Sequence, residues 1–144
     1  MSIVTREGKG SKLTIQEMDG NFEYLEGLSI KPYLVYTALL TQSRGGDPVP
    51  TVLENTFTGE IAFSYFSEGR YNITSSDQEF VQDRTLTQLQ LWGDSAKSSA
   101  RIGNVQWEGP DQLVLRVMDP KTGDLVNVIG GNGILASIEI RVYI

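Results

Sequence analysis

The 144-residue chain has no cysteine and no histidine, which excludes disulfide bonds, thiolate nucleophiles, histidine-ligated metals and a serine–histidine–aspartate triad. Its formal net charge is −6, and no cluster of lysine and arginine offsets this, so we expect no nucleic-acid partner. No apolar run approaches the ~20 residues that span a membrane, and the first residues lack the apolar core of a signal peptide. We therefore expect a protein that folds where it is made, without a membrane.

The first part of the chain predicts an irregular arm followed by a short helix. Residues 1–12 are expected to form an irregular arm. Positions 8–12 of this arm are all small or charged, which is typical of a solvated segment. Thr14 and Glu17 have the spacing of a capping box, in which each side chain satisfies a free backbone N–H of the first helical turn. Gly20 weakens the helix interior by about 1 kcal/mol, and Gly27 is the expected C-terminal stop. The pattern predicts a helix of about three turns.

The apolar residues of this helix are Ile15, Met18, Phe22 and Leu25, at spacings of three, four and three. This is heptad spacing, which places all four on one stripe. A helix this short is marginal alone in water, so the stripe must be buried against something. Two partners remain open: identical chains in a coiled coil, or the β-domain of the same chain.

After Pro32 the pattern changes to strands and turns, with period-two alternation of apolar and polar residues. Eight or nine short strands at intervals of roughly 8–12 residues indicate a β-sandwich or jelly roll. We expect a mainly β protein with an arm and assembly or anchor helix at 1–29 and a β-sandwich domain at 30–144. The expected strands cover residues 33–41, 51–58, 61–66, 70–74, 85–92, 101–107, 113–118, 125–129 and 134–144.

Paired carboxylates are the only familiar catalytic route that remains. Asp77 lies near Glu79, and Asp119 lies near Asp124, but both pairs fall in apparent turns, where aspartate is common because it bonds its own backbone. The segment from Asp119 also fails the EF-hand pattern, because its twelfth position is Gly130 and not glutamate. We expect turn residues here, no catalytic residue, no metal and no cofactor.

Three aromatic residues are candidates for contact with a partner, namely Trp92, Trp107 and Tyr71. Such residues more often lie half-buried in strands. The glycine-rich segment 130–133 lacks the following lysine and helix of a phosphate-binding loop, so we expect a turn there.

The arm and helix also carry a resemblance. The string Ser2–Thr14, continued by Glu17–Phe22, resembles the opening of many tailed-phage fibre and virion proteins, with a lysine-glycine-serine stretch, a leucine-threonine pair, then an acidic residue and asparagine-phenylalanine on a helix. This covers about 20 residues, and Lys12 departs from the proline frequent in the family. More scattered segments, at 32–42, 52–56 and 138–143, resemble small β-domains of phage and prophage structural genes.

The resemblance implies a virion structural protein, assembled in the host cytoplasm as a homotrimer and attached through its N-terminus to other virion proteins. We expect a short tail fibre or fibre-associated component whose β-domain contacts the host surface, including its glycans, or the virion. A capsid decoration (cement) or baseplate protein is the first alternative. A glycan-binding module or a small carboxylate-dependent depolymerase is the second, although we expect no enzyme.

Overall fold

The computed structural model describes residues 3–5, 7, 10–29, 31–43, 45–91, 101–127 and 134–144. Contacts divide the chain into two compact units, Met1–Pro32 and Tyr33–Ile144, which are described separately below. Among the described residues, no helix combines the length and the apolar character needed to cross a bilayer.

The N-terminal unit contains helix α2 (Ile15–Ser29). Its start confirms the predicted capping box: the Thr14 N–H donates to Glu17 Oε2 at 2.8 Å, and the Glu17 N–H donates to Thr14 Oγ1 at 3.3 Å. The predicted stop at Gly27 is wrong, because Gly27 lies inside the helix and does not adopt the positive φ of a glycine stop. The helix therefore has 15 residues, about four turns.

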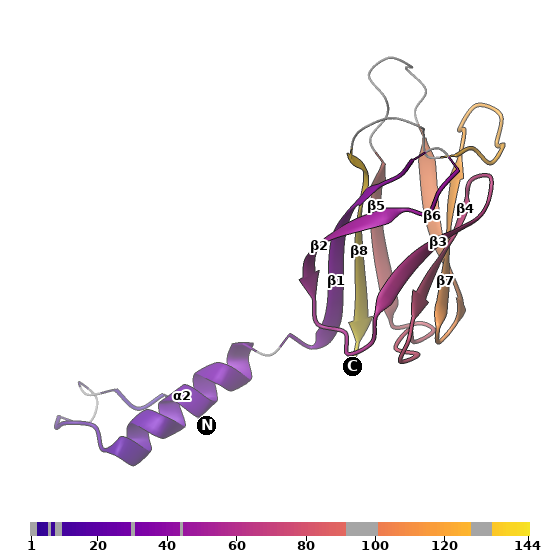
Figure 1. Cartoon of the computed structure of the whole chain (residues 1–144). Helices are drawn as coiled ribbons and strands as arrows, with labels where there is room; N and C mark the ends of the chain where they lie inside the picture. The colour runs from indigo at the N-terminus through magenta and orange to yellow at the C-terminus, as the bar shows by residue number, and fades with distance from the viewer. Residues whose placement is uncertain are drawn as a thin grey trace. The chain divides into compact units, whose positions relative to one another are not determined.

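The second unit is a β-sandwich of two four-stranded antiparallel sheets (Figure 1). The sheets have the strand orders β2-β1-β8-β5 and β3-β4-β7-β6, which we call sheet A and sheet B. The strands are β1 (Tyr33–Thr41), β2 (Val49–Asn55), β3 (Ile61–Ser67), β4 (Arg70–Ser75), β5 (Thr85–Leu91), β6 (Ile102–Gly109), β7 (Gln112–Met118) and β8 (Ile134–Tyr143). The predicted mainly β fold is confirmed.

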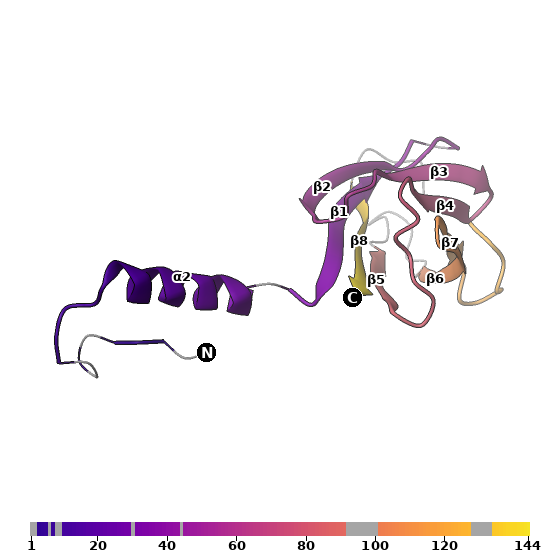
Figure 2. The ribbon, with the colours of Figure 1, turned by 90° about the horizontal axis from the view of Figure 1, so that it is seen from below.

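The core lies between the two sheets, which face each other when seen from below (Figure 2). Alternation decides which side chains enter it: Tyr36, Ala38 and Leu40 of β1 are buried, whereas Thr37 and Leu39 between them are not. The ring of Tyr36 reaches across to Phe63 of β3, with 6.0 Å between ring centroids. One apolar layer therefore joins both sheets, as a sandwich requires.

Three sequence expectations need correction. Strand β2 covers Val49–Asn55 instead of the expected 51–58, and it begins earlier because Val49 and Pro50 pair with the end of β1. The expected strand 125–129 does not form over 125–127, where Leu125 makes only an isolated bridge with Met118; residues 128 and 129 lie outside the described residues. Phe80, which lies outside all the expected strands, is nevertheless a core residue and fills the core from a loop.

The last strand of the sandwich is an interior strand of sheet A. Strand β8 pairs with β1 on one side, from Tyr33 opposite Tyr143 to Thr41 opposite Ile134. It pairs with β5 on the other side, from Thr85 opposite Val142. The first and last strands of the sandwich are thus direct neighbours.

Candidate functional site

The apolar stripe on α2 is the most conspicuous surface of the N-terminal unit. Ile15 is 74% exposed and Phe22 is 65% exposed, and Met18 and Leu25 are also exposed. Burying an apolar side chain of this size contributes roughly 1.5–3 kcal/mol. A four-residue stripe left open in this way is a candidate contact surface for another chain.

The charges of α2 are compatible with self-association along this stripe. The helix contains four carboxylates and no lysine or arginine. With Ile15 and Phe22 at a positions, Asp19 falls at e and Asn21 at g. A parallel coiled coil brings the e position of one helix beside the g position of its neighbour, so the acidic e positions would face neutral side chains.

Asn21 joins the arm to the helix, a role that the sequence reasoning missed. Its Oδ1 accepts from the Val4 N–H at 2.8 Å, and its Nδ2 donates to the Val4 carbonyl, also at 2.8 Å. A single side chain thereby satisfies both backbone groups of Val4, as a neighbouring strand would. The arm near Val4 is held beside α2, and Ile3 and Val4 add exposed apolar surface there.

The first carboxylate pair, Asp77 and Glu79, ties two loops together. Glu79 accepts hydrogen bonds from the backbone N–H groups of Thr58 (2.9 Å) and Gly59 (3.0 Å), from the Thr58 hydroxyl and from Ser75. Burial alone would raise the pKa of Glu79, but these hydrogen bonds outweigh it and lower the pKa. Asp77 also accepts from the Thr58 hydroxyl, at 3.1 Å. Both carboxylates engage the same loop, and they do not face each other across a cleft.

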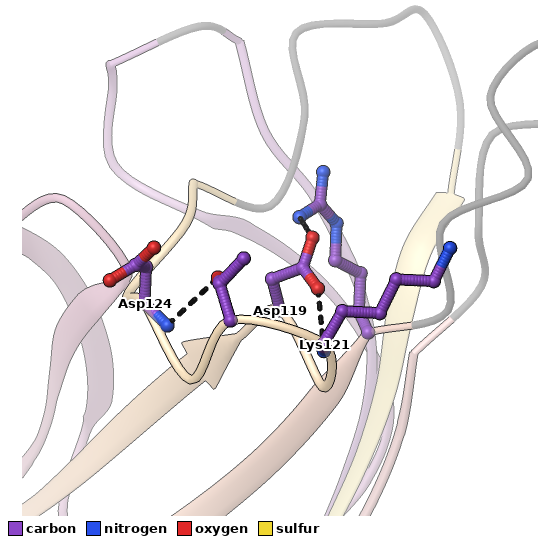
Figure 3. Close-up of polar contacts among 5 residues, drawn as sticks. Asp119, Lys121 and Asp124 are labelled. Carbon is purple, nitrogen blue, oxygen red and sulfur yellow. Dashed lines mark hydrogen bonds and ion pairs between the residues drawn. The ribbon is translucent and has the colours of Figure 1, made fainter.

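The second pair, Asp119 and Asp124, builds the turn predicted for this segment (Figure 3). Asp119 Oδ1 accepts from the Lys121 N–H at 2.8 Å, and the Asp119 N–H donates to the Asp124 carbonyl at 2.9 Å. Gly123 has the positive φ of +75° that closes the turn. In the part of the chain that the structure describes, no three acidic side chains gather as a metal site would need.

Tyr71 and Trp107, the two predicted partner-contact aromatics that the structure describes, do not form an exposed surface. Tyr71 is 1% exposed, and its hydroxyl donates to Gln42 Oε1 at 3.2 Å, so its expected contact role is wrong. Trp107 is half-buried against the core and donates to the Phe80 carbonyl at 3.4 Å. Trp92 and the segment 130–133 lie outside the described residues. Among the described residues of the sandwich, Phe66 is the most exposed aromatic side chain, at 60%.

Comparison with protein-family models, with curated proteins and with solved structures finds no match for this chain. The fold and the site define a β-sandwich protein with a separate N-terminal unit that presents an apolar helix face. What this protein does must therefore be argued from the stripe, the arm and the surfaces of the sandwich.

Proposed function

We propose that the chain is a structural protein of a tailed-phage particle, a short tail fibre or fibre-associated component. It attaches through the N-terminal unit and displays the β-sandwich for contacts with the host or with the virion. The observation that carries the proposal is the exposed stripe on a properly capped helix. The assignment to a phage particle is supported by the resemblance of the arm and helix to the N-terminal segments of phage fibre and virion proteins.

In this proposal three copies bury the stripe together. The seam has large apolar residues at both a and d positions, and Phe22 lies at its middle. A carboxylate at position 22 would be desolvated and would repel its symmetry mates, whereas Glu23 lies off the seam. Self-association should therefore depend on Phe22 and should be insensitive to Glu23.

The first test measures mass in solution by sedimentation for wild type, Phe22→Asp and the matched control Glu23→Ala. We expect wild type and Glu23→Ala to be trimers. For Phe22→Asp we expect the association constant to fall tenfold or more, so that more of the protein is monomeric. A Phe22→Asp protein that remains fully trimeric would show that the helix does not hold the assembly. A monomeric wild type at micromolar concentration would count against self-association.

The second test locates the chain on a particle. Phage particles purified from cells that produce the protein are labelled with gold-conjugated antibody against the β-sandwich and imaged. Label on the tail supports the fibre proposal, and label on the capsid surface or the baseplate supports the decoration or baseplate alternative. Particles without the protein would overturn the assignment to a virion.

A further inference from the structure

Two arginines lie directly opposite each other on the outer face of sheet B. Arg70 of β4 pairs in register with Arg116 of β7. Directly opposed side chains on neighbouring antiparallel strands have Cβ atoms roughly 4.5–5.5 Å apart, and like charges at that position are destabilising. In a chain with net charge −6, this is a costly place for two of its cations.

Among the residues that the structure describes, the charge of this pair is only weakly balanced. Arg116 has one carboxylate nearby, that of Glu108 at 3.8 Å, and both side chains are substantially exposed. The Nε of Arg70 is buried without a hydrogen-bond partner. Among the described residues, the Arg70 guanidinium contacts an aromatic ring. The pair therefore offers unused positive charge to an anion.

That ring belongs to Phe66, which is 60% exposed at an irregularity of β3. The register with β4 shifts between Tyr65 and Ser67, and such bulges turn a side chain away from its regular direction. The Arg70 guanidinium lies over the Phe66 ring, 5.1 Å from its centroid. This contact holds the planar guanidinium in one orientation, which prepares it for two parallel hydrogen bonds to a carboxylate.

Besides Glu108, the neighbouring positions on this face include several neutral side chains that form hydrogen bonds. Ser64 lies opposite Asn72, and Asn72 accepts a hydrogen bond from Gln112 at 3.3 Å. Asn104 of β6 lies opposite Arg116. Amides and hydroxyls of this kind donate to and accept from ligand hydroxyls.

We propose that Phe66, Arg70 and Arg116 form a binding site for an acidic saccharide, a sugar chain that carries carboxylates. The arginines take the carboxylate, the exposed ring packs against the apolar face of a sugar ring, and the amides meet its hydroxyls. An acidic peptide would also satisfy the arginines; the saccharide is favoured because its hydroxyls match the amides and its ring face matches the exposed aromatic ring. The proposal goes beyond attachment to a particle and does not depend on it, because binding is measured on the purified protein.

The test is calorimetric titration of the full chain with two probes, trigalacturonate and a trimer of α2,8-linked sialic acid, and with their methyl esters. We expect at least one acid probe to bind and its ester, which keeps the rings but loses the charge, to bind at least tenfold more weakly. Arg70→Gln and Phe66→Ala should each weaken binding of that probe about tenfold or more. Arg84→Gln and Leu86→Ala, exposed residues outside sheet B, are the matched controls and should bind as wild type does.

Thermal unfolding separates binding from folding. Arg70→Gln removes one of two opposed like charges and also the contact with the Phe66 ring, two effects of similar size and opposite sign, so its melting temperature should stay close to that of wild type, whereas its binding falls. Binding of neither acid probe, or equal binding by wild type and both site variants, would overturn the proposal. Equal affinity for a triglutamate peptide would overturn the saccharide class. A change of oligomeric mass in Arg70→Gln would assign the pair to contact between copies instead.

Discussion

The side-chain amide of Asn21 and the backbone of Val4 make two hydrogen bonds of 2.8 Å each, with Asn21 as acceptor in one and donor in the other. Both partners are exposed or half-buried, so water competes for these bonds. The pairing nevertheless requires an amide, because a carboxylate cannot donate and a methyl group can do neither.

Asn21→Asp and Asn21→Ala are therefore expected to release the arm. The measurement is hydrogen exchange at the Val4 amide, whose protection in wild type comes from Asn21 Oδ1. Alanine should abolish the protection, and aspartate should retain part of it, because a carboxylate still accepts from the Val4 N–H. The exposed Gln16→Ala serves as control. Unchanged exchange protection of the Val4 amide in Asn21→Ala would mean that the hydrogen bonds between Asn21 and Val4 do not persist in solution.

Glycine substitutions should have opposite effects in the two units. A Cβ at Gly20 meets nothing within 4 Å, so Gly20→Ala should stabilise α2 by about 1 kcal/mol and increase its circular-dichroism signal at 222 nm. Gly69 has φ +65°, and a Cβ there would lie 2.6 Å from the Val117 carbonyl oxygen. A left-handed backbone conformation costs a residue with a side chain about 1–2 kcal/mol, and Gly69→Ala should destabilise the sandwich by more than this. Urea unfolding measures the difference. Equal stability of Gly69→Ala and wild type would contradict the geometry of this turn.

The lowered pKa of Glu79 makes part of the sandwich's stability sensitive to acid. A carboxyl whose pKa is lower in the folded state stabilises above its unfolded pKa, and this contribution is lost as the pH falls through the folded pKa. We expect the free energy of unfolding of wild type to decrease below about pH 4.5, the ordinary value for glutamate. Glu79→Gln should lose about 1–3 kcal/mol at pH 7 and respond less to acid. Glu60→Gln, an exposed position on the loop that Glu79 contacts, should behave as wild type.

Tyr36 should make the free energy of unfolding decrease as the pH rises, the opposite of the effect of Glu79. Its hydroxyl is buried without a hydrogen-bond partner, and burial raises the pKa of Tyr36 from 10.0 to about 12. The unfolded chain releases this proton first, so the contribution is complete below pH 10 and is lost between pH 10 and about 12. Tyr36→Phe should remove this loss and raise the free energy of unfolding at pH 7 by about 1 kcal/mol. Destabilisation by Tyr36→Phe would indicate that the hydroxyl has a partner in solution.

Local patterns predicted the elements that depend on neighbours in sequence. The capping box of Thr14 and Glu17, and the alternation that leaves Leu86 outside and Leu89 toward the core, follow from spacing alone. The start of β2 was missed because Val49 and Pro50 look like loop residues, and only pairing with β1 makes them a strand. Pro50 is acceptable there because β2 is an edge strand.

The surface sites of the sandwich could not be predicted from the sequence, because they depend on strand pairings between distant residues. Arg70 and Arg116 become neighbours only through the register of β4 with β7. Three of the four hydrogen bonds of Glu79 come from Thr58 and Gly59, which lie 21 and 20 residues away in the sequence. Tyr71 and Phe66 are both aromatic residues of strands, and only the direction of the side chain makes the first a core residue and the second an exposed one.

The interior position of β8 has a consequence for synthesis on the ribosome. Strand β1 emerges early, but Tyr33 must wait for Tyr143 before it has its neighbour on that side. At elongation rates of about 5–20 residues per second, the wait is roughly 5–20 seconds. During that time the edge of β1 that later pairs with β8 has free backbone N–H and C=O groups, so it can pair with strands of other nascent chains.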